Sequence, residues 1–168
     1  MNVFILLVFA CKPLPECSSN INIMNEQVLD GQYANCTQLV SLTLNNAMMI
    51  GARAFQGCSN LKTVSFIGFI TRISPYAFAD CTSLSGTLNL PQQVGYIADY
   101  AFYNCPLLTS VPLGTAITYI GSFSFYGCSG LSGTFSIPAN VGEIKEGAFQ
   151  GCSSITSITF STTKLTSI

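Results

Sequence analysis

The chain has 168 residues, of which 49% are hydrophobic and only 8% are charged, and its formal net charge is −1 at pH 7. A chain of this length and apolar content can bury a core of its own. Its six cations are scattered along the sequence, so it lacks the basic patch that binding to nucleic acid or to an anionic membrane surface requires.

An apolar run from Val3 to Ala10 opens the chain, ahead of Cys11 and Cys17. This run is too short to span a bilayer, and no later segment reaches membrane-spanning length. It matches the apolar part of a signal peptide, although no Lys or Arg precedes it. We interpret residues 1–27 as a targeting segment followed by an irregular N-terminal part. The alternatives are a lipoprotein cleavage site before Cys11, an apolar chain end, or the residual strand of an earlier repeat.

From residue 28 onward the sequence repeats with a period of 22 to 24 residues. Each unit carries a Cys, with an aromatic residue three positions before it and an aliphatic residue three positions after it. An apolar-x-apolar pair and a further Ile follow. Two units, with "SLSGTLNLP" and "GLSGTFSIP", place one more residue before the pair, so units of two lengths alternate. The repeat cysteines are Cys36, Cys58, Cys81, Cys105, Cys128 and Cys152, and the aromatic residues are Tyr33, Phe55, Phe78, Phe102, Phe125 and Phe149.

The apolar-x-apolar pairs of Val, Phe, Leu and Ile predict short strands that turn one face inward. A unit of this size cannot enclose its own core, so each unit must stack on the next. We therefore predict a solenoid over residues 28–168, with short parallel strands stacked in one sheet and with irregular, turn-like or short helical segments on the other sides. We expect little long helix. Since the pattern stops within a unit at Ile168, we also expect a truncated array whose uncapped ends self-associate.

The pattern I-G-x-x-A-F-x-x-C-x-x-L-x-x-V-x-[FL], as in "IGARAFQGCSNLKTVSF" at residues 50–66, resembles the BspA-like subclass of leucine-rich repeats. The resemblance covers residues 28–168 in five near-complete copies and partial copies at both ends. It implies a leucine-rich-repeat solenoid and a surface or secreted protein of bacteria or parasitic protists that acts in adhesion and protein binding. The departures from the pattern, Tyr33 in place of Phe and Ser124 in place of Ala, matter little for the fold.

The cysteines do not have the spacing of a metal site, since structural zinc needs four closely spaced ligands and the chain has no His. Equivalent side chains on stacked strands run parallel and lie about 4.8 Å apart, whereas the Cβ atoms of a disulfide prefer about 3.8 Å. We predict that all six repeat cysteines form a column of buried free thiols that pack as small apolar residues. Cys11 and Cys17 lie outside this column and could pair with each other in an oxidising compartment.

Residues suited to catalysis are sparse. Without His, the chain can form neither a Ser–His nor a Cys–His nucleophile pair. Glu143 and Glu146 flank Lys145 in a segment that we interpret as a solvated corner, and "STTK" at residues 161–164 spells S-x-x-K without its partner motifs. We therefore expect a non-enzymatic protein without cofactor or metal.

The outward positions of the predicted strands form a row of mostly Ser, Thr and Asn. Each contact with such a row is weak, because binding hot spots favour Trp, Tyr and Arg, but many repeated contacts add up. We predict that the row binds an extracellular or cell-surface protein or glycan. The alternative is a structural spacer or surface coat without a ligand of its own. The row consists of Ser41, Thr43, Asn45, Thr63, Ser65, Thr87, Asn89, Ser110, Thr134, Ser136, Ser157 and Thr159.

"NCT" at residues 35–37 is an N-glycosylation acceptor if the protein is secreted by a eukaryotic cell. Asn35 could equally be an ordinary turn residue. Together, the apolar N-terminal run and the family resemblance predict an extracellular or cell-surface location.

Overall fold

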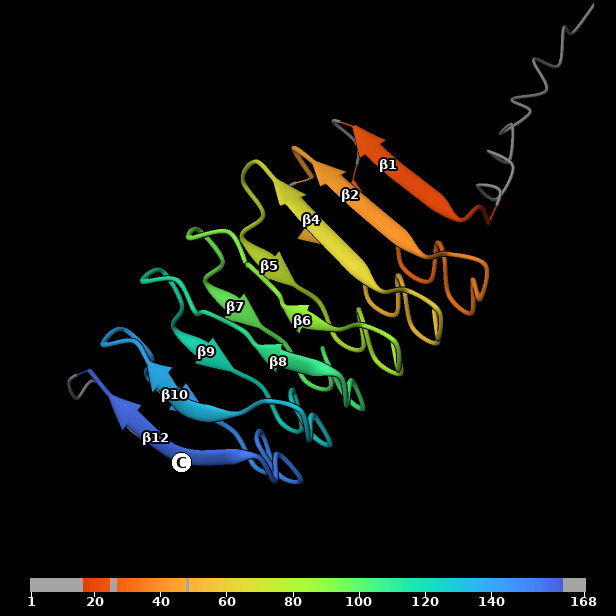
Figure 1. Ribbon diagram of the computed structural model, residues 1–168. Coiled ribbons are helices and arrows are strands. Elements are labelled where there is room, and N and C mark those ends of the chain that lie inside the picture. Colours follow the sequence, from red (N-terminus) through yellow and green to blue (C-terminus); the bar gives the residue numbers. More distant parts are fainter. Residues whose placement is uncertain (1–16, 25–26, 48, 162–168) are drawn as a thin grey trace, which may run out of the picture.

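A computed structural model (Figure 1) describes residues 17–24, 27–47 and 49–161, which coil into a solenoid of parallel strands. The described residues form twelve strands and no helix. Successive turns pass through a front row and then through a back row of strands. The front row holds β1 (Asn20–Met24), β2 (Ser41–Asn45), β4 (Thr63–Ile67), β6 (Gly86–Thr87), β8 (Leu108–Ser110), β10 (Gly133–Ile137) and β12 (Ile155–Phe160). The back row holds β3 (Met49–Ile50), β5 (Arg72–Ile73), β7 (Tyr96–Ile97), β9 (Tyr119–Ile120) and β11 (Glu143–Ile144).

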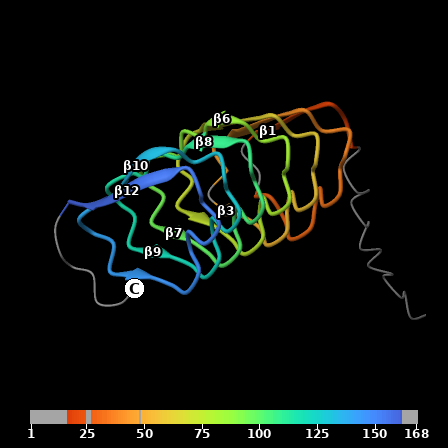
Figure 2. The ribbon, with the colours of Figure 1, turned by 60° about the horizontal axis from the view of Figure 1, so that its bottom comes forward.

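The two rows lie on different sides of the coil (Figure 2). The back row is one five-stranded sheet in the order β11-β9-β7-β5-β3, with every pair parallel. The front row is divided into three sheets, β1-β2-β4, β6-β8 and β10-β12. The predicted solenoid of short parallel strands is confirmed, and the back row is a second set of strands that we did not predict.

The front row breaks at the two longer units. Their strands begin at Gly86 and Gly133, which have φ values of 75° and 72°. The additional residue displaces β6 from β4 and β10 from β8, and the register shifts again where these strands pair with the turn that follows. We expected one sheet, but the structure has three, because an inserted residue interrupts the hydrogen bonding between neighbouring strands.

The solenoid includes β1, which precedes the predicted start at residue 28. Ile21 and Ile23 lie in register with Leu42 and Leu44 of β2, and Ile23 is buried in the core. The alternating residues of β1 therefore supply the front strand of one additional turn. Residues 1–16, with the predicted targeting segment and Cys11, lie outside the described residues.

One aromatic ring from each turn lies along the interior, and these rings form a single stacked column. From Tyr33 to Phe149, neighbouring ring centroids are 5.3 to 5.6 Å apart and the ring planes differ by 1° to 11°. Phe55, Phe78, Phe102 and Phe125 are completely buried. Each aromatic pair of this kind adds about 0.5–1.5 kcal/mol beyond the burial of its area. The predicted interior column is confirmed.

Two residues in each turn, one on either side of the ring residue, adopt the left-handed backbone conformation. The second of them directly precedes the Cys, and in every turn it is Asn, Asp or Gly. These types tolerate positive φ best, so backbone conformation explains the composition of this position. The residues, with φ between 55° and 80°, are Asn35, Gly57, Asp80, Asn104, Gly127 and Gly151.

The segment around the ring residue is also tied directly to the following turn. The backbone N–H of Phe55 donates to the carbonyl of Ala77 at 2.8 Å, and the N–H of Phe78 donates to that of Ala101 at 2.8 Å. The backbone N–H of Phe102 likewise donates to the carbonyl of Ser124. Ring stacking and backbone hydrogen bonding therefore hold the same residues in place.

Replacing a central ring should destabilise the whole array. Phe102→Ala leaves a cavity between Phe78 and Phe125, so we expect the free energy of unfolding to fall by about 3–5 kcal/mol, measured by urea denaturation followed by circular dichroism. The exposed Thr87→Ala on β6 is the control and should change it by about 0.5 kcal/mol or less. Equal effects of the two variants would contradict the stacked core.

Candidate functional site

The outward residues of the front row are mostly polar, and Met24 and Ile67, which flank Asn45, are exposed apolar exceptions. Their inward neighbours, such as Leu42, Leu44 and Leu88, are buried in the core. The predicted row residues Ser41, Thr43, Asn45 and Ser110 are half-buried. The remaining ones, Thr63, Ser65, Thr87, Asn89, Thr134, Ser136, Ser157 and Thr159, are exposed. The structure therefore brings all of the predicted row residues to one side of the solenoid, and none of them carries a charge.

Hydroxyl groups on adjacent front strands bond to one another. The hydroxyls of Thr134 and Ser157 lie 2.9 Å apart, and the Thr159 hydroxyl donates to that of Ser136 at 3.2 Å. At the other end of the row, the Ser41 hydroxyl donates to the Asn20 side chain. The pair β10 and β12 therefore presents two coupled hydroxyl pairs, and the pair β1 and β2 presents a coupled hydroxyl and amide.

A cleft of about 420 Å³ opens in the front row where β8 and β10 are not paired. We call it the front cleft. Leu131, Phe135 and Pro138 are among the apolar residues that line it. Its hydroxyl-bearing residues are Thr109, Ser110, Thr115, Ser132, Thr134, Ser136 and Ser161. With no charged residue in its lining, the front cleft offers hydrogen-bonding hydroxyls beside apolar surface.

The front cleft includes Ser110, Thr134 and Ser136 of the predicted row, but the sequence interpretation did not foresee that the row is hollowed there. A signal was present, because the additional residue near Gly133 interrupts strand pairing, and Pro112 cannot donate a backbone hydrogen bond. The longer repeat unit, with its additional residue, therefore indicates where the front cleft lies.

Five of the six repeat cysteines are buried free thiols, as predicted: Cys58, Cys81, Cys105, Cys128 and Cys152. Each thiol donates to the backbone carbonyl of the aromatic residue in the preceding turn, from Cys58 to Tyr33 at 3.2 Å through Cys152 to Phe125 at 3.1 Å. The thiols are thus weak donors that join turns, as well as small apolar residues.

The family-model comparison agrees with this architecture. The model described as "BspA type Leucine rich repeat region" matches six copies, over residues 9–132 and 86–168. The chain belongs to the BspA-type leucine-rich repeat family. No curated protein matches it.

Solved leucine-rich repeat proteins share the BspA-type fold of this chain. A leucine-rich repeat protein of T. pallidum is 26% identical with a TM-score of 0.80, and the match covers 86% of this chain and 70% of that one. One from Eubacterium ventriosum is 28% identical with a TM-score of 0.61, covering 80% of this chain and 34% of that one. The pneumococcal vaccine antigen PcpA, 18% identical with a TM-score of 0.61, is similar in fold over 87% of this chain and 42% of its own.

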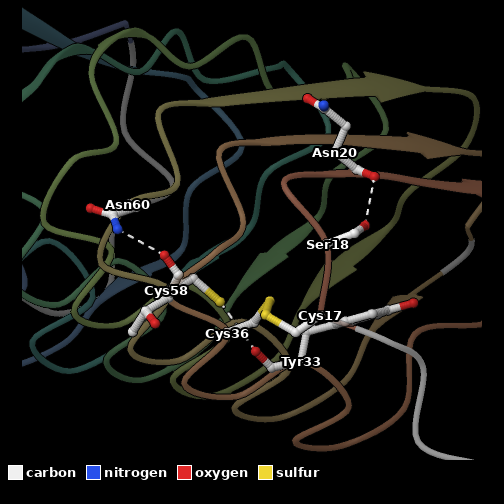
Figure 3. Close-up of a disulfide and its surroundings, with 8 residues drawn as sticks. Cys17, Ser18, Asn20, Tyr33, Cys36, Cys58 and Asn60 are labelled. Atoms are coloured by element: carbon white, nitrogen blue, oxygen red, sulfur yellow. Dashed lines mark hydrogen bonds between the residues drawn. A yellow bond between two sulfur atoms is a disulfide. The ribbon is translucent and has the colours of Figure 1, made fainter.

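The first BspA-type unit departs from the predicted thiol column. Cys36 forms a disulfide with Cys17, with the Cα atoms 5.5 Å apart (Figure 3). The prediction of a free Cys36 and the suggested pairing of Cys17 with Cys11 were therefore wrong. Cys17 precedes Cys36 by only 19 residues, so it does not occupy the equivalent position of a stacked turn. The parallel alignment that keeps repeat cysteines apart does not apply to it.

Asn35 of the glycosylation motif is exposed and lies in a left-handed turn, with φ of 60°. Its side chain lies over Gly57 of the following turn, where a Cβ atom would collide with the Asn35 amide oxygen. The next residue in the motif, Cys36, is the disulfide-bonded one. Exposure is compatible with modification, and glycosylation of Asn35 stays a prediction.

Within residues 17–24, 27–47 and 49–161, no group of three or more His, Cys, Asp or Glu side chains could hold a metal ion. The same residues contain no helix of the length and apolarity needed to cross a membrane. Glu143 and Lys145, predicted to lie in a solvated corner, form an ion pair of 2.7 Å on the back side of the solenoid. The described BspA-type solenoid thus presents a polar strip and a cleft as its candidate site.

The buried thiols should make the fold less stable in alkali. Burial raises the pKa of Cys58 to about 11 and that of Cys152 to about 12, from the ordinary value of 9.0. Their contribution is therefore complete below pH 9.0 and is lost as the pH rises through the folded pKa values. We expect the free energy of unfolding to fall by up to about 1.4 kcal/mol per pH unit for each thiol, measured by urea denaturation in a series of alkaline buffers.

The Cys58→Ala variant isolates one thiol from the tyrosines that also titrate in alkali. It should unfold more easily at neutral pH, yet lose less additional stability than the unmodified chain as the pH rises. An alkaline slope identical to that of the unmodified chain would show that burial does not hold the proton on Cys58.

Proposed function

We propose that this chain is a non-enzymatic, extracellular or cell-surface binding module whose front row recognises a protein or glycan. One observation carries the proposal: an uncharged strip of hydroxyl and amide groups crosses the front strands and deepens into the front cleft. Such a surface suits a partner that is itself rich in uncharged hydrogen-bonding groups.

The dimensions and chemistry of the front cleft support a binding role. Its volume of about 420 Å³ falls within the range of small-ligand pockets, about 300–1,000 Å³. Ser110 and Thr134 supply groups that both donate and accept hydrogen bonds, and Pro112, Leu113 and Pro138 supply apolar contact. A sugar unit or an uncharged stretch of polypeptide combines the same two kinds of surface.

Repetition supports binding to a partner that is itself extended or repeated. The coupled hydroxyls of Thr134 with Ser157 and of Ser136 with Thr159 recur two residues apart along β10 and β12. Several weak contacts made simultaneously give a combined affinity that exceeds any single one. The front row is therefore suited to a surface that offers several copies of one group.

The surface or secreted location rests on the family and on the disulfide. The resemblance to BspA-like repeats implies a surface or secreted protein, and one structural neighbour is a vaccine antigen. The Cys17–Cys36 disulfide is compatible with an oxidising compartment. The proposal includes a targeting role for the N-terminal part of residues 1–27, and glycosylation of Asn35 where a eukaryotic cell secretes the chain. The proposal also includes self-association through the end of the array at β12. Its apolar residues Ile158 and Phe160 are 40% and 45% exposed and would be buried by such contact.

Binding to immobilised extracellular-matrix proteins and to a glycan array tests the proposal. We expect saturable binding to at least one partner. Ser110→Arg and Thr134→Arg each place a bulky charge in the front cleft and should weaken binding at least tenfold, which corresponds to about 1.4 kcal/mol. Ser65→Arg tests the row outside the cleft, and the exposed Ser153→Arg, next to Cys152 and outside the row, is the matched control.

The pattern of losses separates the alternatives. Loss with Ser65→Arg as well as with the cleft variants would show that the whole row binds. Unchanged binding in all three row variants would refute the front row as the binding surface. Absence of binding to any protein or glycan would favour the structural spacer.

A further inference from the structure

Six of the seven tyrosines of the chain gather on the side of the solenoid formed by the back row and the turn that follows it. Their rings stack in three short columns: Tyr96 on Tyr119 at 4.3 Å, Tyr76 on Tyr100 at 4.6 Å, and Tyr103 on Tyr126 at 5.0 Å. Phe123 extends the second column at 5.3 Å from Tyr100. All seven rings are half-buried. We call these residues the tyrosine face.

The tyrosine face is built at a cost in backbone strain. Arg53, Tyr76, Tyr100 and Phe123 occupy the first left-handed position of their turns, with φ between 53° and 58°. The corresponding residues of the outer turns are Gly31 and Gly147, which adopt positive φ without strain. A residue with a Cβ atom is less stable there by about 1–2 kcal/mol. Four inner turns nevertheless carry a large side chain, and strain of this kind is typical of functional surfaces.

Charges flank the rings unevenly. At one end, the guanidinium groups of Arg53 and Arg72 lie over Tyr76 and Tyr96, at 4.9 and 4.3 Å from the ring centroids. Asp30 is near this end, and its carboxylate accepts a hydrogen bond from the backbone N–H of Ala52. Asp80 lies beside Tyr103 and accepts a hydrogen bond from the Asn104 side chain. The positive charge at this end is therefore concentrated on the two guanidinium groups that cover Tyr76 and Tyr96.

Among the residues that the structure describes, the other end of the tyrosine face has more anions than cations. Glu143 and Glu146 lie there with Lys145, which pairs with Glu143 and lies 5.9 Å from the Tyr119 ring centroid. Asp99 adds a carboxylate that raises the pKa of both Tyr100 and Tyr119, although desolvation is the larger cause. Burial and a hydrogen bond with Tyr96 raise the pKa of Tyr119 to about 12. The rings of Tyr100 and Tyr119 thus stay uncharged at neutral pH.

We propose that the tyrosine face binds the tyrosine face of a second copy of this chain, with the two solenoids antiparallel and related by a two-fold axis. This arrangement places Arg53 and Arg72 of each copy opposite the acidic end of the other, and it brings the uncharged rings together at the centre. A parallel arrangement would oppose like charges. Tyr and Arg are the residue types on which binding energy concentrates, and an isologous pair needs a surface complementary to itself.

The pairing goes beyond the proposed function and is independent of it. The front row lies on a different side of the solenoid from the back row (Figure 2), so the front clefts of a paired molecule remain open. A paired molecule therefore carries two front rows, one on each copy, that face different directions and can engage two separate partners.

Light scattering and sedimentation at several concentrations test this pairing. We expect a reversible dimer that weakens as salt concentration rises, because screening reduces the attraction between the charged ends. Tyr100→Gly removes a central ring at a position whose backbone accepts Gly, so the chain should fold and its dimer dissociation constant should rise at least tenfold. Thr87→Ala, on the front row, is the control and should leave the constant unchanged.

Charge reversal distinguishes this surface from any other. Arg72→Glu and Glu146→Arg should each weaken the dimer, and the chain that carries both changes should recover it. A monomer at every concentration would overturn the proposal, even if the tyrosine face then bound another protein or a glycan. So would a dimer that resists Tyr100→Gly but is lost with Ile158→Lys, since that result would place the contact at the end of the array. Binding through the front row is measured separately, so either proposal can fail alone.

Discussion

Each turn of this protein buries its aromatic ring only because the neighbouring turns cover it. Phe102 is completely buried between Phe78 and Phe125 at centroid distances of 5.6 and 5.4 Å, and a single turn would leave the same ring in water. Burying a Phe side chain contributes about 1.5–3 kcal/mol. The free energy of unfolding therefore depends on contacts between neighbouring turns and not on any single turn. The front row, the front cleft and the tyrosine face exist only as consequences of stacking.

The chemistry near each ring keeps successive turns aligned. Two left-handed residues bend the chain around it, and the ring residue donates its backbone N–H to the following turn, as Phe78 does to Ala101. Its carbonyl accepts a hydrogen bond from a cysteine thiol, as that of Tyr33 does from Cys58. Cys suits this position because it is small enough for the core and carries a weak donor. At the first unit the Cys17–Cys36 disulfide adds a covalent link to the same region (Figure 3).

The core was predictable from the repeat, because residues at equivalent positions of successive units stack on one another, so the aromatic residues and the cysteines each form a column. The alternation around Leu42 and Leu44 likewise predicted which side chains of a strand face outward. The Cys17–Cys36 disulfide was not predictable in this way, since it joins residues that are not equivalent in the repeat. The front cleft was missed because the sequence shows the additional residue near Gly133 but does not show that β8 and β10 then fail to pair. The tyrosine face was not predictable because its residues occupy variable positions of the repeat. Their side chains lie together only because residues such as Tyr76 adopt the left-handed backbone conformation.

The two sides of the solenoid differ in chemistry although one stacked core supports both. Ser and Thr hydroxyls occupy the front row, and stacked tyrosines with arginines occupy the back. Hydrogen exchange of the native chain, followed amide by amide, tests most directly whether neighbouring turns hold this core together. The amides of Phe78 and Phe102, with stacked rings on both sides, should exchange slowest, and those of β12, where Ile158 and Phe160 are exposed, should exchange much faster. Equally fast exchange in the central turns and in β12 would contradict the account.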